Sequence, residues 1–270
     1  MVRKFRNQII GLVRFSYPAQ GGFAKRSDDS ASPEATLYDP ARLARRFHLF
    51  EHLTLPSLLA QTDADFQTIF LIGESLPAAA RARLEAAIAP LAGATIVALP
   101  SLIHYRATQT AFAVLRDAKA SHLTGFRLDD DDALDRAFVA RLRANVAALV
   151  PVCPVGRPLA VAASRGFFVE QLPGGNAVFD VHEKLPPSVG LAMTVPAGCD
   201  ENIFRRNHRL VPQYYTTFSD ADTPAFIRSV HRDNDSQPAT SGISHQMTEA
   251  AIKSAIDAQF PFTLAELETF

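Results

Sequence analysis

Apolar segments that alternate with helical patterns run through the first 150 residues and limit the folds open to this chain. Four segments have the length and composition of buried strands; they lie at 8–15, 66–73, 94–99 and 123–128. Apolar residues at helical spacing predict the intervening helices at 42–59 (interrupted near Pro56), 77–91, 107–120 and 135–150. Strands that alternate with helices favour a mostly parallel sheet with helices on both faces. The sequence therefore predicts an α/β fold.

The pattern changes after Pro151. The elements expected beyond it are two paired strands at 159–170 and 176–181, a short helix at 200–208 and an amphipathic helix at 247–259. We therefore expect an α/β half over residues 1–150 and an α+β half over residues 151–270, packed as one unit.

Composition narrows the class of protein. Of 270 residues, 47% are hydrophobic and 20% are charged, as in a globular domain with a substantial core. A net charge of −1 gives no general attraction to nucleic acid or to an anionic membrane. Cys153 and Cys199 fit neither metal spacing nor a disulfide framework. No apolar stretch approaches the ~20 residues of a membrane span, so we expect a cytoplasmic protein that lies at most at the periphery of the inner membrane.

Four consecutive aspartates, 129–132, follow the strand predicted at 123–128. Ligands of open α/β sheets bind beyond the carboxyl ends of the strands. A divalent cation would offset the repulsion between the carboxylates, and oxygen ligands suit Mg²⁺ or Mn²⁺. Asp129 and Asp131 therefore form a candidate metal site. Strand alternation also places Arg127 on the same side as Asp129, which predicts a salt bridge between them.

Two other interpretations of the aspartates are open. The first is a solvated acidic turn in which Asp132 or Asp135 caps the next helix. The second is a phosphatase whose nucleophile is the first Asp of a D-x-D-x-Thr motif; Ala133 in place of Thr counts against it. An EF-hand loop is excluded because the turn glycine and the late glutamate are missing.

Longer runs resemble known enzymes. Leu55–Ser75 and His104–Leu134 resemble the first helix, second strand and D-x-D region of family-2-type glycosyltransferases of the GT-A fold. Three further motifs resemble a narrower bacterial family of rhamnosyltransferases: VRFSYP at 13–18, FRLDDDDAL at 126–134 and FIRSVHRDNDS at 226–236.

The resemblance implies a nucleotide-sugar donor, dTDP-rhamnose or similar, and a saccharide or glycolipid acceptor. Asp129 and Asp131, with Asp130 beside them, would hold Mn²⁺ or Mg²⁺ against the diphosphate, where the metal acts as a Lewis acid. His231 would join the metal or the diphosphate, or would be a buried structural histidine. Arg14 would bind phosphate or the base edge, or would pair with a nearby carboxylate.

An inverting enzyme of this type also needs a general base for the acceptor hydroxyl. Asp200 and Glu201 fit the helix start where the resemblance places it, although they also suit an N-cap and a first-turn acid. Asp180 and Glu183 are further candidates. The chain departs from the family-2 pattern at the end of its second strand, where 72–75 (IGES) replaces a nucleotide-binding Asp pair.

We therefore expect a metal-dependent, inverting glycosyltransferase. The alternatives are the phosphatase and a non-catalytic module that binds nucleotide-sugar. The long loop at 19–39 is expected either to cover the donor or to lack order.

Overall fold

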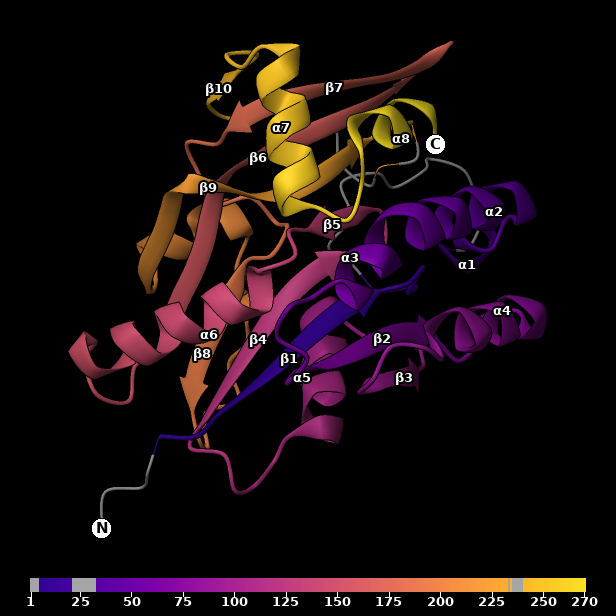
Figure 1. The fold of residues 1–270 in the computed structure, drawn as a ribbon. Coiled ribbons are helices and arrows are strands. Elements are labelled where there is room, and N and C mark those ends of the chain that lie inside the picture. The colour runs from indigo at the N-terminus through magenta and orange to yellow at the C-terminus, as the bar shows by residue number, and fades with distance from the viewer. Residues whose placement is uncertain (1–4, 21–32, 233, 235–239) are drawn as a thin grey trace.

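The four apolar segments of the first half form neighbouring parallel strands (Figure 1). They are β1 (Asn7–Arg14), β2 (Gln67–Gly73), β3 (Ala94–Leu99) and β4 (His122–Asp129). Their order in the sheet is β4-β1-β2-β3, and all three pairings are parallel. The computed structural model of the chain describes residues 5–20, 33–232, 234 and 240–270. The predicted α/β fold with a mostly parallel central sheet is confirmed.

The second half of the chain extends the same sheet beyond β4. Its strands are β5 (Asp132–Leu134), β6 (Leu159–Leu172), β7 (Gly175–His182), β8 (Ala192–Pro196), β9 (Thr216–Val230) and β10 (Ile243–Ser244). β8 runs antiparallel to β4 and to β6, and β6 and β7 form the predicted hairpin. β9 pairs with both β5 and β6. The strands from both halves thus belong to one sheet.

β9 was not predicted. Its apolar pattern is broken by Asp220, Asp222 and Pro224, residue types that usually mark turns. The register with β6 shifts where β9 passes this point, between Ala163 and Gly166 of β6. A long parallel pairing with β6 therefore compensates for a local sequence that favours a loop.

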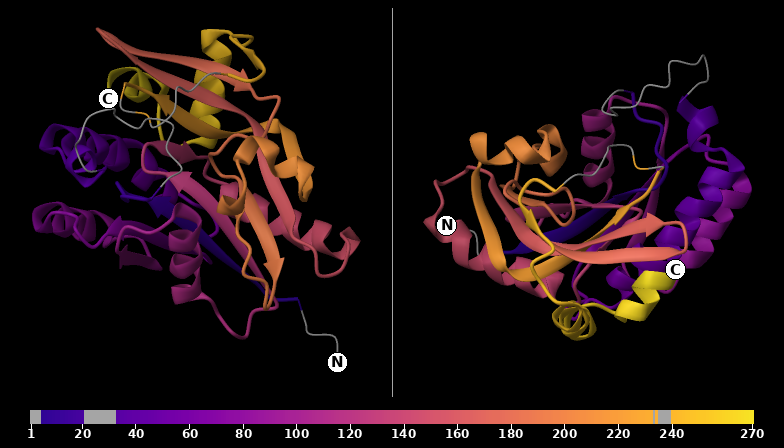
Figure 2. Two further views of the ribbon diagram at one scale, coloured as in Figure 1. Left: turned by 180° about the vertical axis from the view of Figure 1, so that it is seen from behind. Right: turned by 90° about the horizontal axis from the view of Figure 1, so that it is seen from above.

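Both faces of the sheet are covered, as the continuous apolar strands require. Alternate residues of β1 point in opposite directions. Ile9 and Val13 join one core, whereas Ile10 and Leu12 join another. The helices of the first core are α2 (Pro40–Leu49), α4 (Ala78–Ile88) and α6 (Phe138–Leu149), and the helix of the second is α5 (His104–Leu115). Figure 2 shows the helices on the two sides of the sheet.

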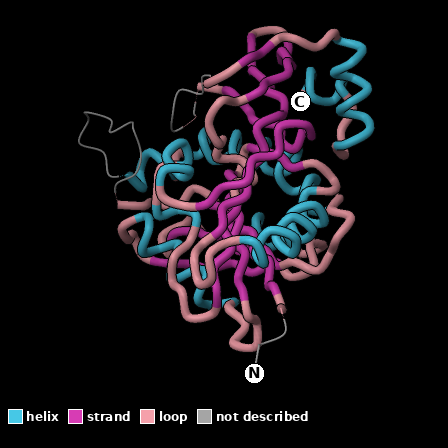
Figure 3. Tube along the Cα trace, turned by 90° about the vertical axis from the view of Figure 1, so that its left-hand side faces the viewer, coloured by secondary structure: helices cyan, strands magenta, loops and turns pink. Residues whose placement is uncertain are grey.

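The C-terminal helices cover the far end of the sheet, beside β6 and β9 (Figure 3). They are α7 (Glu249–Gln259), which confirms the predicted amphipathic helix, and α8 (Leu264–Thr269). Phe260, between them, packs edge-on against Phe167 of β6 with ring centroids 6.0 Å apart. Ile227 of β9 and Leu53 lie in the same core. This third core joins the C-terminus to the first half of the chain.

The helix expected at 42–59 continues past Pro56. It consists of α2, a π-helical turn at Phe50–Thr54 and α3 (Leu55–Leu59). Pro56 lies in the first turn of α3, where its missing N–H costs little. The expected interruption is therefore a change of helix type.

Two other predicted helices have different bounds. α5 begins before the expected 107–120 and ends where Arg116 adopts an extended backbone. The expected helix at 200–208 is instead two 3₁₀ helices, Ile203–Arg205 and His208–Gln213. Each follows an asparagine whose side chain accepts a hydrogen bond from a nearby backbone N–H, which favours short turns over one continuous helix.

The expected long loop at 19–39 contains one short helix, α1 (Pro33–Leu37). Residues 21–32 lie outside the described residues, so the expectation that this loop covers a ligand stays a prediction. Within the described chain, no helix combines the length and the apolar character needed to cross a membrane.

The β6–β9 pairing gives the first testable prediction. Gly166 lies opposite Phe226, and a Cβ at Gly166 would collide with the Phe226 carbonyl oxygen and ring. Because a backbone atom cannot move aside cheaply, we expect Gly166→Ala to lower the free energy of unfolding by about 1–3 kcal/mol. Chemical denaturation measures this change. Glu170→Ala, on the same strand, is the control and should cost less; equal stability of Gly166→Ala and the wild type would contradict the pairing.

Candidate active site

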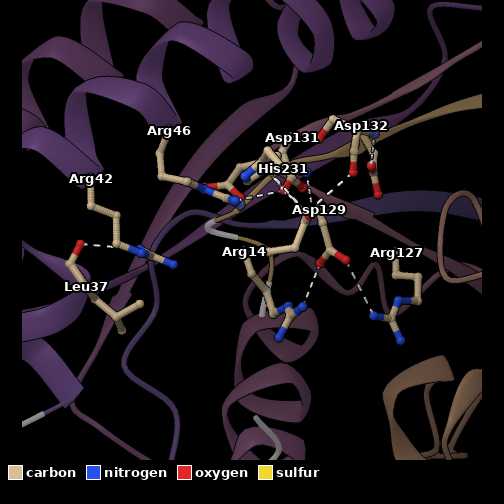
Figure 4. Close-up of polar contacts among 12 residues, drawn as sticks. Arg14, Leu37, Arg42, Arg46, Arg127, Asp129, Asp131, Asp132 and His231 are labelled. Carbon is tan, nitrogen blue, oxygen red and sulfur yellow. Dashed lines mark hydrogen bonds and ion pairs between the residues drawn. The ribbon is translucent and has the colours of Figure 1, made fainter. Parts of the chain in front are cut away.

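The carboxyl ends of β1 and β4 bring Arg14 and Asp129 together. These residues are register partners, and the Arg14 Nη2 donates to Asp129 Oδ1 at 2.6 Å (Figure 4). Arg127 Nη2 lies 3.7 Å from Asp129 Oδ2, which confirms the predicted salt bridge. Burial opposes ionisation of Asp129, but the charges of Arg14 and Arg127 hold its pKa well below the ordinary value. Asp129 is therefore a carboxylate held between two guanidinium groups.

Asp130 and Asp131 share a third arginine, Arg46 of α2. Arg46 Nη1 donates to Asp131 Oδ2 at 2.7 Å, and its Nε donates to Asp130 Oδ2 at 3.3 Å. Its Nη2 also donates to Asp130 Oδ1. Arg46 is only 7% exposed, and the two aspartates are 1% and 4% exposed. The guanidinium therefore offsets two carboxylates in a region that water scarcely reaches.

The segment after β9 also contacts Asp131. His231 Nε2 lies 3.0 Å from Asp131 Oδ2, and Asn234 Nδ2 donates to the same oxygen at 3.2 Å. Burial favours the protonated acid, but the charge of Arg46 and the hydrogen bond with His231 lower the pKa of Asp131 to about 2. The structure thus places His231 at the aspartates, beside the carboxylate that the sequence made a candidate metal ligand.

The last aspartates do not cap α6. Asp132 lies in β5, where its Oδ1 accepts a hydrogen bond from Ser229 N at 3.1 Å. Burial and the neighbouring charge of Asp131 raise the pKa of Asp132 well above its ordinary value. Asp135 precedes the helix and accepts from Ala137 N at 2.9 Å, yet α6 has no side-chain cap. The prediction of a capped, solvated acidic turn is wrong, because tertiary contacts bury these carboxyl groups.

The aspartates border a cavity of about 420 Å³, which we call the first cavity. Seven arginines line it together with Asp129–Asp132; they are Arg14, Arg42, Arg46, Arg127, Arg205, Arg206 and Arg228. Seven guanidinium groups against four carboxyl groups leave a surplus of at least three positive charges. Planar guanidinium groups bind phosphate and carboxylate oxygens in pairs. The first cavity therefore suits a ligand with several negative charges.

Two histidines also line the first cavity. Burial, assisted by the charges of Arg14 and Arg127, lowers the pKa of His104 to about 3. Burial, assisted by Arg127 and Arg228, lowers the pKa of His208 to about 3 as well. Both imidazoles are therefore neutral near pH 7, so the positive charge of the first cavity comes from the arginines.

The structure separates the two main candidates for a general base from the aspartates. The Asp200 side chain is 84% exposed and pairs with Arg116 at 3.2 Å; it is not among the residues that line the first cavity. Glu201 lines a neighbouring cavity and pairs with Arg205 at 3.2 Å. Of the two, Glu201 lies nearer to the first cavity, through Arg205.

The other acids, Asp180 and Glu183, hold backbone segments. Asp180 Oδ1 accepts from the backbone N–H groups of Gln246 and Met247, each at 2.9 Å. Glu183 Oε2 accepts from Ser241 N at 2.8 Å. These bonds connect the end of β7 to the chain around β10, so both acids have a structural role in the fold.

The donor chemistry of the aspartates fits a hard divalent cation. Asp129 and Asp131 are both ionised, and the hydrogen bonds that Asp131 accepts from Arg46, His231 and Asn234 all end on Oδ2. Among the residues that the structure describes, however, no three His, Cys, Asp or Glu side chains form a group that could hold a metal ion. Metal binding by Asp129, Asp131 and His231 therefore stays a prediction.

Sequence reasoning missed five of the seven cavity arginines, namely Arg42, Arg46, Arg205, Arg206 and Arg228. Arg46 follows Leu43 by three residues and precedes Phe50 by four, so it lies in the apolar stripe of α2. A lone arginine in such a stripe is the signal that could have identified it. Arg205, Arg206 and other cavity arginines from the second half carry no comparable signal, because they come from segments without a clear period.

A family model described as "Putative rhamnosyl transferase" matches residues 8–243, most of the sequence. The chain belongs to this family. The resemblance inferred from the motifs is thereby confirmed. No curated protein matches the sequence significantly.

Several solved structures have similar folds at low sequence identity. The S. aureus TarS fragment 1–349 in complex with UDP-GlcNAc is 9% identical, with a TM-score of 0.48 over 84% of this chain and 60% of that one. The same fragment with UDP is 10% identical, with a TM-score of 0.46 over 83% and 60%. A 4-diphosphocytidyl-2C-methyl-D-erythritol synthase from Anaerococcus prevotii is 8% identical, with a TM-score of 0.36 over 93% and 96%. The chain thus spans 60% of the TarS fragments.

The buried position of Arg46 gives the second prediction. Removal of its charge would leave Asp130 and Asp131 buried without their shared partner, so we expect Arg46→Met to lower the free energy of unfolding by about 3–5 kcal/mol. Urea denaturation measures the loss. Arg81→Met, at a half-exposed arginine paired with Glu85, should change stability by less than about 0.5 kcal/mol. A small effect of Arg46→Met would show that water reaches the aspartates.

The two neutral histidines give the third prediction. Their pKa values of about 3 lie below the ordinary 6.5, so the unfolded chain binds protons at His104 and His208 that the folded chain excludes. Stability should be fully present above pH 6.5 and fall as the pH drops toward 3, with a slope of up to about 1.4 kcal/mol per pH unit for each histidine.

Denaturation between pH 7 and 5 measures this slope. His104→Asn and His208→Asn should each flatten it. An unaltered slope in both variants of the buried histidines would contradict their neutral state.

Proposed function

We propose that this protein transfers a sugar from a nucleotide-sugar donor to a saccharide or glycolipid acceptor. The observation that carries the proposal is the arginine-rich first cavity at the carboxyl edge of the sheet, in a chain of the rhamnosyl transferase family. Ligands of open α/β sheets bind at this edge. A nucleoside diphosphate has the negative charge that the surplus of arginine attracts.

The arginines would bind the donor diphosphate. Arg14 and Arg127 extend from β1 and β4 at the base of the cavity, and Arg228 comes from β9. Arg205 and Arg206 come from the opposite segment and are exposed, so they can reach a ligand without breaking a buried network. As the sugar leaves, negative charge grows on the diphosphate, and fixed guanidinium groups stabilise that charge.

Asp129 and Asp131 would hold Mn²⁺ or Mg²⁺, with His231 beside them. When bound, the ion would supply a Lewis acid for the departing diphosphate. Arg46 keeps Asp131 ionised and fixes its position, so these carboxylates need no proton loss before an ion binds. Carboxylates that are already ionised and held in position are what a preformed cation site requires.

The acceptor hydroxyl must lose a proton as its oxygen bonds to the anomeric carbon and the carbon–phosphate oxygen bond breaks. In an inverting reaction the base lies on the acceptor side of the sugar. Of the two candidates, Glu201 fits this role better than Asp200, because it lines the cavity next to the arginines Arg205 and Arg206.

The proposal also covers the identity of the sugar and of the donor nucleotide. The family description favours L-rhamnose, and dTDP-rhamnose is the donor that we expect. The nucleotide-binding Asp pair of family-2 enzymes has no equivalent here, and Tyr38 packs so tightly over Gly73 that a Cβ there would collide with its hydroxyl. The base must therefore be bound by other groups, or Glu74 must take the place of the pair.

Calorimetric titration with dTDP, UDP and GDP, each with and without Mn²⁺, tests the proposal. We expect one nucleotide to bind in a metal-dependent manner. Asp131→Ala should abolish transfer and weaken nucleotide binding in the presence of Mn²⁺ by at least about tenfold. Asp257→Ala, at an exposed aspartate of α7, is the control.

The same experiment separates the alternatives. Failure to bind any nucleotide, together with hydrolysis of a simple phosphomonoester, would favour a phosphatase with Asp129 as nucleophile. Nucleotide binding without transfer or hydrolysis would favour a non-catalytic binding module. Wild-type turnover in Asp131→Ala would refute the role given to the aspartates.

A further inference from the structure

A second cavity lies beside the first and shares one residue with it. Its volume is also about 420 Å³, within the range of small-ligand sites. Arg206 lines both cavities, so a ligand in one would lie next to a ligand in the other. The remaining wall comes from residues 154–158 and 214–216, which belong to the second half of the chain.

The second cavity combines an aromatic ring with positive charge. Tyr214 is 48% exposed, and Arg206 lies over its ring at 4.1 Å from the centroid. The apolar face of a sugar ring packs well on such an exposed aromatic ring. Arg157, between Pro154 and Pro158, is exposed and lines the same cavity. A sugar in this cavity would therefore meet an exposed aromatic ring and two guanidinium groups.

The acidic residue of the second cavity is already neutralised. Glu201 pairs with Arg205 at 3.2 Å, and its carboxylate is also hydrogen-bonded to the Tyr215 hydroxyl. Arg157 and Arg206 are consequently not balanced by the one carboxylate of the cavity. The surplus of positive charge favours a sugar that carries a carboxylate or a phosphate over a neutral one.

We propose that the second cavity binds the acceptor and selects a saccharide with a negatively charged group. This inference rests on the proposed function, since it assigns the acceptor to the cavity next to the donor. Tyr214 supplies the stacking surface, and Arg157 recognises the charged group. Glu201, which lines the second cavity and pairs with Arg205 of the first, is placed to accept the proton of the acceptor hydroxyl.

Titrations with three small probes test the selection, with binding followed by ligand-observed NMR. The probes are methyl β-D-glucuronide, methyl β-D-glucoside 6-phosphate and the neutral methyl β-D-glucoside. We expect the wild type to bind at least one charged probe about threefold or more tightly than the neutral one. The comparison between the two charged probes separates carboxylate from phosphate recognition.

Two variants locate the binding. Arg157→Gln should remove the preference for the charged probe while binding of the neutral glycoside stays the same. Tyr214→Ala should weaken all probes by up to about tenfold. Arg81→Gln, at a half-exposed arginine of α4, is the matched control and should change nothing. Nucleotide affinity should stay at the wild-type value in Arg157→Gln and Arg81→Gln, because neither residue lines the first cavity. Tyr214→Ala is left out of this comparison because Arg206, which lines the first cavity, lies over the Tyr214 ring.

Equal binding of charged and neutral probes, absence of binding to all three, or wild-type behaviour of both variants would overturn the inference. Displacement of the charged probe by nucleotide would also overturn it, because the probe would then lie in the first cavity. If no nucleotide binds but the charged probe shows the expected pattern, the proposed donor site fails while the second cavity stands as a site for anionic saccharides.

Discussion

The contact between Arg46 and the two aspartates Asp130 and Asp131 organises the candidate site. Carboxylates in sequence repel each other, and burial makes that repulsion stronger. One guanidinium from α2 offsets both charges and joins the helix to the end of β4. Asp131 is then free to keep its charge at a pKa of about 2. Without this contact, the acidic segment would have to protonate or turn outward, and the first cavity would lose its shape.

The continuous sheet brings the remaining groups to the same place. β9 pairs with β5, which begins at Asp132, the last of the four aspartates, so the register of β9 fixes Arg228 and the segment that carries His231. Arg14 and Asp129 are fixed by the β1–β4 register in the same way. The functional side chains thus depend on backbone pairing for their positions. The turn that carries Asp130 and Asp131, the exposed Arg205 and Arg206, and the segment with His231 and Asn234 lie outside the strands.

The sequence predicted the parts of this arrangement that local patterns encode. Apolar strands, the aspartate run and the Arg127–Asp129 salt bridge follow from periodicity and strand alternation. Arg46, the shared partner of Asp130 and Asp131, was not predicted, because it comes from a distant helix. β9 was missed because its acidic and proline residues resemble a turn, and only pairing with β6 makes it a strand. The prediction that Asp132 or Asp135 caps α6 was wrong because long-range contacts compete with the cap.

The contacts of Asp131 with Arg46 and His231 also determine when the site can form during synthesis. Arg46, Asp131 and His231 come from the first, middle and last thirds of the chain, and their contacts close loops of more than 80 residues. Such long-range closure is slow compared with helix formation. A nascent chain that has not yet emerged past His231 would lack one partner of Asp131 and the end of β9. The contacts around Asp131 would therefore be complete only after the segment that carries His231 has left the ribosome.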